Sequence, residues 1–363
     1  MTGSSPHRTP CAPLLPEMPL SLQVFALAGA VAFVSTALAV HIGPRMRALV
    51  DTPRARHHHR KPMPRIGGVA LFAGFAAASA LAYTSAPLSN PADERRIVGV
   101  LIGCAFLFFI GLLDDWCELG WLPQLLAQLG AAVIAIGATV FIERFTNPFS
   151  GDVVELHLWP FVGPVLVFIL TCFWIVGMMN TVNWLDGLDG LAAGVGAIAA
   201  ILFAVHMISL AQQQVSLYAL ALAGACLGVL PFNFNPARIF LGGTGAMVLG
   251  YALATLSILA PARLATALLV MAVPITDTAW QIFHRYRRGA SILHGDRGHL
   301  HFRLIDLGHS QRRIVIGYWV AAAAFGALSL TVSSQLIKLA ALILLMTVTI
   351  FYLSRLSRQD SLS

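Results

Sequence analysis

The segment Asn180-Thr-Val-Asn-Trp-Leu-Asp186-Gly-Leu-Asp189-Gly190 lies between two long apolar stretches of the chain. It therefore places carboxylates, amides and glycines where a membrane helix would meet water. A charge at such a position is costly and needs an ion, a substrate or an opposite charge as its partner. A second acidic pair, Asp114 and Asp115, ends a different apolar stretch in the same way. Together the two acidic segments predict an active site at the membrane face.

The composition predicts an all-α, polytopic integral membrane protein. Of the 363 residues, 58% are hydrophobic and only 11% are charged, so we expect lipid to be the main solvent. Each apolar stretch is expected to be helical, because an open strand in lipid leaves backbone groups unpaired. Windows of about 20 residues predict eleven transmembrane helices, at about 20–40, 66–84, 97–113, 122–142, 160–179, 189–209, 215–232, 244–260, 263–283, 314–332 and 335–353.

The chain is predicted to hold a single membrane-embedded domain over residues 20–353. Residues 1–19 are rich in Pro and Ser and are expected to form a disordered outer tail, and residues 354–363 a cytoplasmic tail. With the N-terminus outside, the inner loops and the C-terminal tail carry 17 of the 23 Lys and Arg residues. This asymmetry predicts an outer N-terminus and a cytoplasmic C-terminus.

The remaining composition excludes other classes. The net charge of +7 follows from the inner-surface bias, so nucleic acid is not expected as a partner. The five cysteines are scattered and lack metal-type spacing, which indicates core residues rather than disulfides or ligands. Nearly every polar cluster falls in an inner loop, so we expect the function to face the cytoplasm across a plasma membrane.

The first inner loop, residues 51–68, is rich in cations and contains three adjacent histidines, His57, His58 and His59. Neighbours in an extended chain point in alternate directions and seldom converge on one ion. Two interpretations remain open: a loop that contacts lipid headgroups, or a phosphate-binding rim that includes Arg65.

The two acidic segments have the chemistry of a magnesium site. Hard carboxylate oxygens suit Mg²⁺, which prefers one or two carboxylates plus substrate phosphates. An Asp at a helix C-terminus opposes the helix dipole, which argues against a merely solvated role for Asp114 and Asp115. Asp186 and Asp189 are three residues apart and share a face if helical. Asn180 and Asn183 add amide groups suited to a base or a sugar.

Two later loops complete the polar set. Residues 231–245 place glycines before a helix start, where backbone N–H groups can hold phosphate, and Phe240 could stack on a base; a plain glycine-rich turn is the alternative. In residues 291–304, His299, His301 and Arg303 suit sugar hydroxyls or pyrophosphate better than zinc. Asp277 is an intramembrane carboxylate and a functional candidate for that reason.

Taken in order, these clusters resemble the polyprenyl-phosphate N-acetylhexosamine-1-phosphate transferases, glycosyltransferase family 4. The resemblance implies that UDP-HexNAc gives its sugar-1-phosphate to a polyprenyl phosphate, such as undecaprenyl phosphate, with release of UMP. It also implies Mg²⁺ or Mn²⁺ as cofactor, a possible homodimer, and a role in cell-wall or surface polysaccharide synthesis. The matching segments are 51–68, 111–115, 180–191, 233–245 and 299–308.

The family pattern also implies residue roles. Asp114 and Asp115 are expected to activate or position the lipid phosphate, and Asp186 and Asp189 to serve metal and nucleotide. The implied metal ligands are Asp115 and Asp186. Asn233 and Phe240 match the positions of a uracil pocket. Contacts to sugar and phosphates are expected from His299, His301 and Arg303.

Three positions depart from the family pattern. Gly243 stands where the family has an Asp that is thought to bind Mg²⁺, Gln124 where it has a Lys, and Phe302 where it has a His. The departures leave a second interpretation open, a family member that binds polyprenyl phosphate or nucleotide without turnover. A transporter is the third interpretation. Against it, the polar residues lie at one face of the membrane and do not form a path across it.

Overall fold

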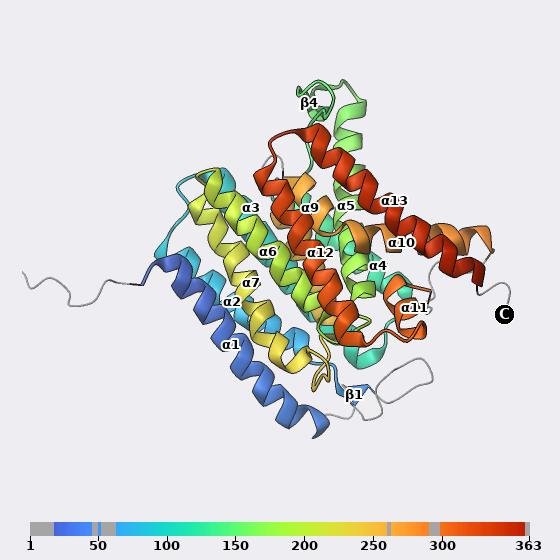
Figure 1. Cartoon of the computed structure of the whole chain (residues 1–363). Coiled ribbons are helices and arrows are strands. Elements are labelled where there is room, and N and C mark those ends of the chain that lie inside the picture. The colour runs from blue at the N-terminus through green and yellow to red at the C-terminus, as the bar shows by residue number, and fades with distance from the viewer. Residues whose placement is uncertain (1–17, 46–49, 52–62, 260–262, 290–297, 360–363) are drawn as a thin grey trace, which may run out of the picture.

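The computed structural model describes residues 18–45, 50–51, 63–259, 263–289 and 298–359. The predicted outer tail lies outside these residues except for its last two positions, and so do His57, His58, His59 and the last four residues of the predicted cytoplasmic tail. Within the described ranges the chain is a helical bundle, which confirms the predicted fold class (Figure 1). The α-helices are α1 Leu20–Ile42, α2 Gly67–Ser85, α3 Pro91–Cys117, α4 Trp121–Gly137, α5 Val162–Leu185, α6 Leu191–Ser209, α7 Gln213–Asn233, α8 Gly242–Ile258, α9 Arg263–Val270, α10 Ala272–Arg287, α11 Leu300–Asp306, α12 Gln311–Thr331 and α13 Gln335–Gln359.

Every predicted apolar window contains a helix. Eight helices of the described chain are long and apolar enough to cross a membrane, namely α1, α2, α3, α5, α6, α7, α12 and α13. The helices α4 and α8 are shorter, with 17 residues each. These lengths confirm a polytopic helical membrane protein.

We expected one straight helix over the window 263–283. The structure instead has two helices there, α9 and α10, with a bend of 74° between them. Pro274 lies in the first turn of α10 and has no N–H to donate to the carbonyl four residues earlier, at Val270. Val270 is the last residue of α9. Hydropathy alone does not register such a break, so the prediction missed it. As a result α10 runs across the bundle rather than along it (Figure 1).

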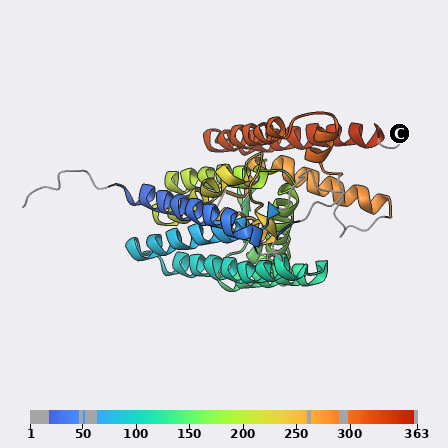
Figure 2. The ribbon, with the colours of Figure 1, turned by 90° about the horizontal axis from the view of Figure 1, so that it is seen from below.

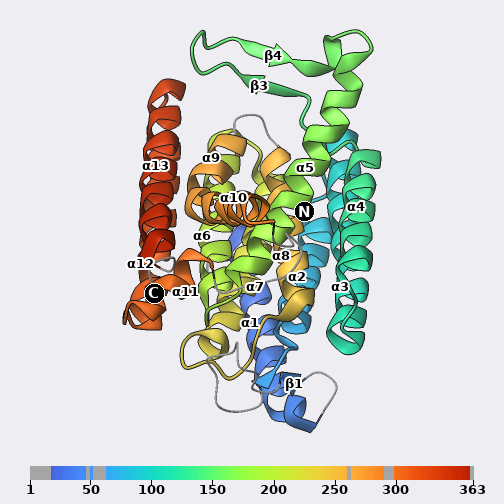
Figure 3. The same ribbon diagram turned by 90° about the vertical axis from the view of Figure 1, so that its right-hand side faces the viewer.

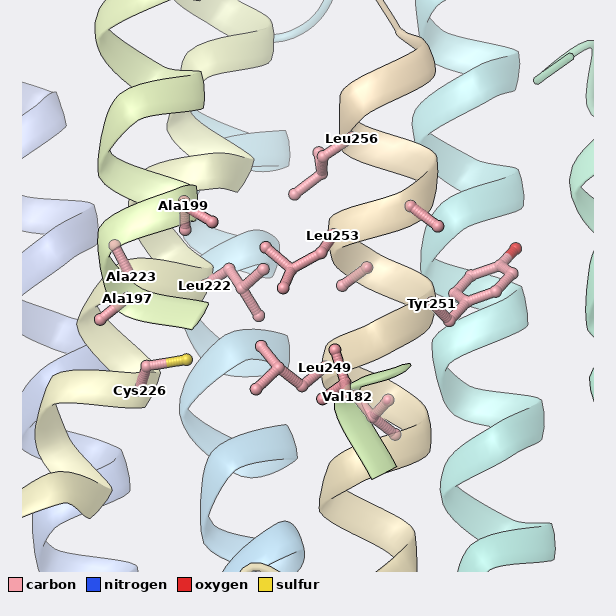
Figure 4. Close-up of a cluster of buried hydrophobic side chains, with 14 of the residues drawn as sticks. Val182, Ala197, Ala199, Leu222, Ala223, Cys226, Leu249, Tyr251, Leu253 and Leu256 are labelled. Atoms are coloured by element: carbon pink, nitrogen blue, oxygen red, sulfur yellow. The ribbon is translucent and has the colours of Figure 1, made fainter. Parts of the chain in front are cut away.

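Helices α7 and α8 lie in the interior of the bundle. Helix α8 packs on α3 and α5, and α7 packs on α1, α2 and α6. Seen from below, α12 and α13 form one edge and α3 and α4 the opposite edge (Figure 2). Between α7 and α8 the core is apolar, with Leu222, Leu249 and Leu253 in the same cluster (Figure 4). This core holds the ends of α7 and α8 in fixed positions.

Two short antiparallel strand pairs mark the opposite ends of the bundle. The pair β1 Val50–Asp51 and β2 Met63–Pro64 lies at one end, and the pair β3 Arg144–Thr146 and β4 Val153–Glu155 projects beyond the other (Figure 3). The polar turns after α3, α5 and α7 all lie at the end of β1 and β2. The fold therefore gathers the acidic segments at one end.

Candidate active site

A cavity of about 760 Å³ opens at this end of the bundle. Eight predicted site residues line it: Arg65, Asp114, Asp115, Asn183, Asp186, Asp189, Asn233 and Phe240. Its wall also holds all three positions that depart from the family pattern, Gln124, Gly243 and Phe302. Four predicted residues, Asn180, His299, His301 and Arg303, are not part of the wall. Most of the predicted residues therefore line one cavity.

Glycines bring the start of α8 against α2 and α3. A Cβ on Gly68 would lie 2.3 Å from the backbone nitrogen of Gly245, and one on Gly111 would lie 2.6 Å from the Cα of Thr244. Neither distance is possible for a larger residue without a backbone shift. Because Gly111 lies one turn before Asp115, this contact carries Asp115 to the first turn of α8.

Asp115 caps the N-terminus of α8. Its Oδ1 accepts the N–H of Gly243 at 3.0 Å, and its Oδ2 accepts the N–H of Thr244 at 3.1 Å and the hydroxyl of Thr244 at 2.6 Å. A carboxylate is favourable here because the first N–H groups of a helix lack intrahelical partners and carry a partial positive charge. Asp115 is thus an anion held by α8.

Asp114 is held by Gln124, which stands at the position where the family pattern has a lysine. The side-chain nitrogen of Gln124 donates to both carboxylate oxygens of Asp114, at 2.9 and 3.1 Å, and also faces the carbonyl of Leu119 at 3.3 Å. The amide therefore replaces a cation as the donor, and it leaves the charge of Asp114 in place.

Asp189 braces the opposite wall of the cavity. Its Oδ2 accepts the side-chain N–H of Asn235 at 2.9 Å and the backbone N–H of Ala237 at 3.1 Å. Asn235 also donates to Oε1 of Gln311, at the start of α12, at 2.8 Å. One oxygen of Asp189 therefore fixes the loop after α7, while the residue still lines the cavity as predicted.

Asp186 lies between these two walls. Burial raises the pKa of Asp186 well above its usual value, and the carboxylates of Asp189 and Asp115 raise it further. The backbone N–H of Gly242 and the guanidinium of Arg65 lower that pKa, but do not offset the rise. Among the described residues of the cavity wall, carboxylates therefore outnumber cations.

The predicted amides have different surroundings. Asn233 is buried and donates its side-chain N–H to the carbonyl of Ile239 at 3.0 Å, while its Oδ1 has no hydrogen-bond partner among the described residues. A buried acceptor without a donor is costly, so Oδ1 is suited to a ligand donor. Asn180 instead donates to Oε1 of Gln128 at 2.7 Å and to the carbonyl of Val176, away from the cavity.

The segment 298–303 lies behind the cavity wall. His299 donates from Nδ1 to Oδ2 of Asp277 at 3.0 Å, and its ring stacks on His301 with centroids 5.6 Å apart. Burial lowers the pKa of His301 to about 3, so this ring is neutral. Phe302, whose ring centroid lies 4.3 Å from that of His301, is the residue of this segment that reaches the cavity.

Sequence reasoning missed several residues of the wall. Asn235 lies inside a segment that we singled out, and its position two residues after Asn233 was the available signal. Gln311 carries no such signal, since nothing local marks the start of α12 as part of a site. Other wall residues that we did not predict include Met63, Glu118, Leu119, Pro236, Ala237 and Met247.

The oxygen donors of the cavity wall decide whether the site suits Mg²⁺. The described ranges contain no group of three or more His, Cys, Asp or Glu side chains able to hold a metal. Asp114, Asp115 and Asp186 nevertheless supply hard oxygens to one cavity, and Mg²⁺ often takes one or two carboxylates plus substrate phosphates. These residues fit an ion that binds together with a phosphate substrate, not a closed protein cage.

Comparison with known proteins identifies the class. The sequence profile of glycosyl transferase family 4 matches residues 97–261, which include Asp115, Asp186 and Gly243. The chain belongs to this family, as its motifs had indicated.

Relatives cover most of the chain. It is 33% identical to a probable undecaprenyl-phosphate N-acetylglucosaminyl 1-phosphate transferase of Bacillus subtilis, over 81% of this chain and 80% of the relative. It is 34% identical to a decaprenyl-phosphate N-acetylglucosaminephosphotransferase of Mycobacterium tuberculosis, over 85% and 83%. A phospho-N-acetylmuramoyl-pentapeptide-transferase of Desulforudis audaxviator is 32% identical, over 80% and 90%. These names confirm the prediction of a phospho-sugar transferase.

Proposed function

We propose that the protein transfers an N-acetylhexosamine-1-phosphate from a UDP-sugar to a polyprenyl phosphate, undecaprenyl phosphate being the expected acceptor, and releases UMP. The observation that carries the proposal is the single cavity that brings together Asp114, Asp115 and Asp186 with the start of α8. Carboxylates that can share a divalent cation with phosphate groups, at a membrane end of the bundle, suit two phosphorylated substrates of which one is a lipid.

In this reaction an oxygen of the lipid phosphate attacks the phosphorus that bears the sugar. A new P–O bond forms, the bond from that phosphorus to the UMP oxygen breaks, and UMP leaves with the electron pair. Because both reactants are anions, the protein must offset their repulsion. Among the described residues that line the cavity, Arg65 is the cation, while the N–H groups of Gly243 and Thr244 already donate to Asp115.

Asp115 and Asp186 are the proposed Mg²⁺ ligands, with Mn²⁺ as a substitute. When bound, the ion would offset phosphate charge and polarise the leaving phosphate. Asp114, held by Gln124, would position the lipid phosphate, and Asn233 Oδ1 would accept a hydrogen bond from the nucleotide base.

The proposal includes a membrane arrangement. Eleven crossings result if α4, α8 and the bent pair α9–α10 each span the bilayer along with the eight longer helices. The distribution of Lys and Arg then favours a cavity at the cytoplasmic face of a plasma membrane, the side on which UDP-sugars are made. Cysteine labelling of Cys117, which is exposed at the cavity end, by an impermeant reagent in sealed vesicles would check the orientation.

The test of the reaction is UMP release by purified protein given UDP-GlcNAc, undecaprenyl phosphate and Mg²⁺. We expect EDTA to abolish the release, and Asp186→Asn to lower it by at least about a hundredfold, the size typical of losing an electrostatic group in an active site. Asp93→Asn, at the opposite end of α3, is the matched control and should leave the rate unchanged. Release that persists in Asp186→Asn would contradict the assignment.

A second candidate function is binding without turnover. It is favoured by one observation: Gln124, Gly243 and Phe302 all line the cavity, so the departures fall at the site itself. Calorimetric binding of UDP-GlcNAc or of undecaprenyl phosphate by folded protein, without UMP release from any UDP-sugar tested, would support this candidate over the transferase.

A further inference from the structure

Helix α10 presents a buried polar stripe that faces the histidine segment. Asp277, Gln281 and Arg285 follow one another at intervals of four residues, so they lie on one face of the helix. Their exposed fractions are 4%, 1% and 4%. Burial of three polar side chains in a row destabilises the fold unless each has a partner. The partners of these three residues therefore indicate which segment the stripe stabilises.

The stripe holds the segment that begins at Gly298. Asp277 accepts the Nδ1–H of His299 on Oδ2 and the backbone N–H of Leu300 on Oδ1, both at 3.0 Å. Gln281 donates its side-chain N–H to the carbonyl of Gly298. One turn further, the guanidinium of Arg285 lies over the ring of Trp184 at 5.8 Å.

The contact with Asp277 selects which ring nitrogen of His299 carries a proton. A carboxylate can only accept, so Nδ1 must carry the proton. The other ring nitrogen, Nε2, is then the one that exchanges hydrogen bonds or protons with other groups. The centroid of the His299 ring also lies 5.3 Å from the ring centroid of Trp184. Trp184 is two residues before Asp186 in the sequence.

From His299 the packing continues to the cavity. The His299 ring stacks on His301, and the ring of His301 contacts Phe302. A Cβ on Gly187 would lie 2.6 Å from Nε2 of His301 and 2.8 Å from Cζ of Phe302, so the segment presses on the backbone next to Asp186. Both ring nitrogens of His301 are buried without a hydrogen-bond partner among the described residues.

We infer that Asp277 is a positioning residue of the transferase. It fixes the proton of His299 on Nδ1 and, through the start of α11, holds His301 and Phe302 against Gly187 beside Asp186. This role rests on the proposed function, because the segment that it positions reaches the cavity at Phe302 and packs on Gly187, next to Asp186. No atom of Asp277 itself lines the cavity.

The test compares wild-type protein with Asp277→Asn. An Asn can donate to Nδ1, which favours the proton on Nε2. We expect the kcat for UMP release to fall by about 10- to 100-fold, the usual effect of removing a group that orients a functional histidine, with KM changed less than threefold. Thr276→Val is the matched control: its hydroxyl is buried and has no hydrogen-bond partner among the described residues, so its kcat should stay within twofold of wild type.

A second readout does not depend on turnover. In ¹⁵N-histidine-labelled protein, with the signal of His299 assigned by its loss in His299→Gln, we expect Nδ1 to be protonated in wild type and not in Asp277→Asn. A wild-type His299 with the proton on Nε2 alone would overturn the inference even if Asp277→Asn does not fold.

The outcomes separate the two claims. If wild-type protein releases no UMP from any donor, the proposed function fails, and the proton position on His299 still decides whether Asp277 orients the ring. If wild-type protein is active and Asp277→Asn matches Thr276→Val in kcat, the positioning role is wrong while the transferase remains.

Discussion

The side-chain amide of Gln124 donates to both carboxylate oxygens of Asp114, at 2.9 and 3.1 Å. This contact joins the start of α4 to the last turn of α3 and sets the direction of a cavity carboxylate. Because the donor is neutral, it adds no positive charge beside Asp114, and the backbone of Leu119 also bonds to this carboxylate.

We predict that Gln124→Leu lowers kcat/KM for undecaprenyl phosphate by about tenfold or more. Hydrogen bonds to a charged group contribute about 1.5–3 kcal/mol, and a freed carboxylate no longer points into the cavity. Initial rates of UMP release at varied lipid concentration measure the effect. Gln213→Leu, at the far end of α7, is the control, and an equal loss in both variants would point to a general effect of the substitution.

Thr244→Val tests the cap of α8. Valine keeps the shape of threonine and removes the hydroxyl that lies 2.6 Å from Oδ2 of Asp115. We expect the free energy of unfolding to fall by about 1.5–3 kcal/mol, with a lower melting temperature by differential scanning fluorimetry and a weaker rate of UMP release.

Thr255→Val is the matched control for this cap. Its hydroxyl is equally buried on α8, but bonds only to carbonyls of its own helix, at Tyr251 and Ala252. Its melting temperature should therefore change much less. A Thr244→Val protein as stable and active as Thr255→Val would show that the hydroxyl does not matter to Asp115.

The location of the site was predictable because acidic segments ended apolar stretches. Asp114, Asp115 and Asp186 each follow a membrane helix on the same predicted side, and any bundle with that topology gathers them. The sequence did not show what each oxygen contacts. Asp189 braces Asn235 and Ala237, contacts that depend on how the loop after α7 folds back.

The histidine segment shows a second limit. His299 and His301 were predicted at the site from their polarity, but the structure buries both behind Phe302. Their position depends on α10, and α10 crosses the bundle only because the chain bends after Val270. Apolar windows detect hydrophobic length, and they do not detect the direction of a helix after a proline.

Gly243→Asp should create a metal-responsive site. A Cβ at this position would lie 3.1 Å from Oδ2 of Asp114 and 3.3 Å from Oδ1 of Asp115, so a third carboxylate would join the pair. Like charges at this separation repel, which predicts a lower melting temperature in EDTA. Mg²⁺ should reverse the loss, because a cation offsets the added charge.

The measurement is the melting temperature of wild type, Gly243→Asp and Gly243→Asn as Mg²⁺ is added. Asparagine has nearly the size of aspartate without its charge, so it controls for crowding. We expect the half-saturating Mg²⁺ concentration to fall by about tenfold in Gly243→Asp alone, a gain of about 1.4 kcal/mol. The same response in Gly243→Asn would show that the added negative charge does not strengthen Mg²⁺ binding.

Asp186 should make the stability of the protein depend on pH. Its pKa in the folded protein is raised above the value of 3.8 expected when unfolded, mainly by burial. The folded state therefore holds this proton more tightly, and the stabilisation is fully present below about pH 3.8 and lost as pH rises through the folded pKa.

In EDTA, Asp186→Asn should accordingly melt at a higher temperature than wild type at neutral pH, and the gap should close as the pH falls toward 4. The same variant should have lost UMP release, since stability and activity oppose each other at a crowded acidic site. A gap that stays constant from pH 4 to pH 8 would mean that ionisation of Asp186 does not limit stability.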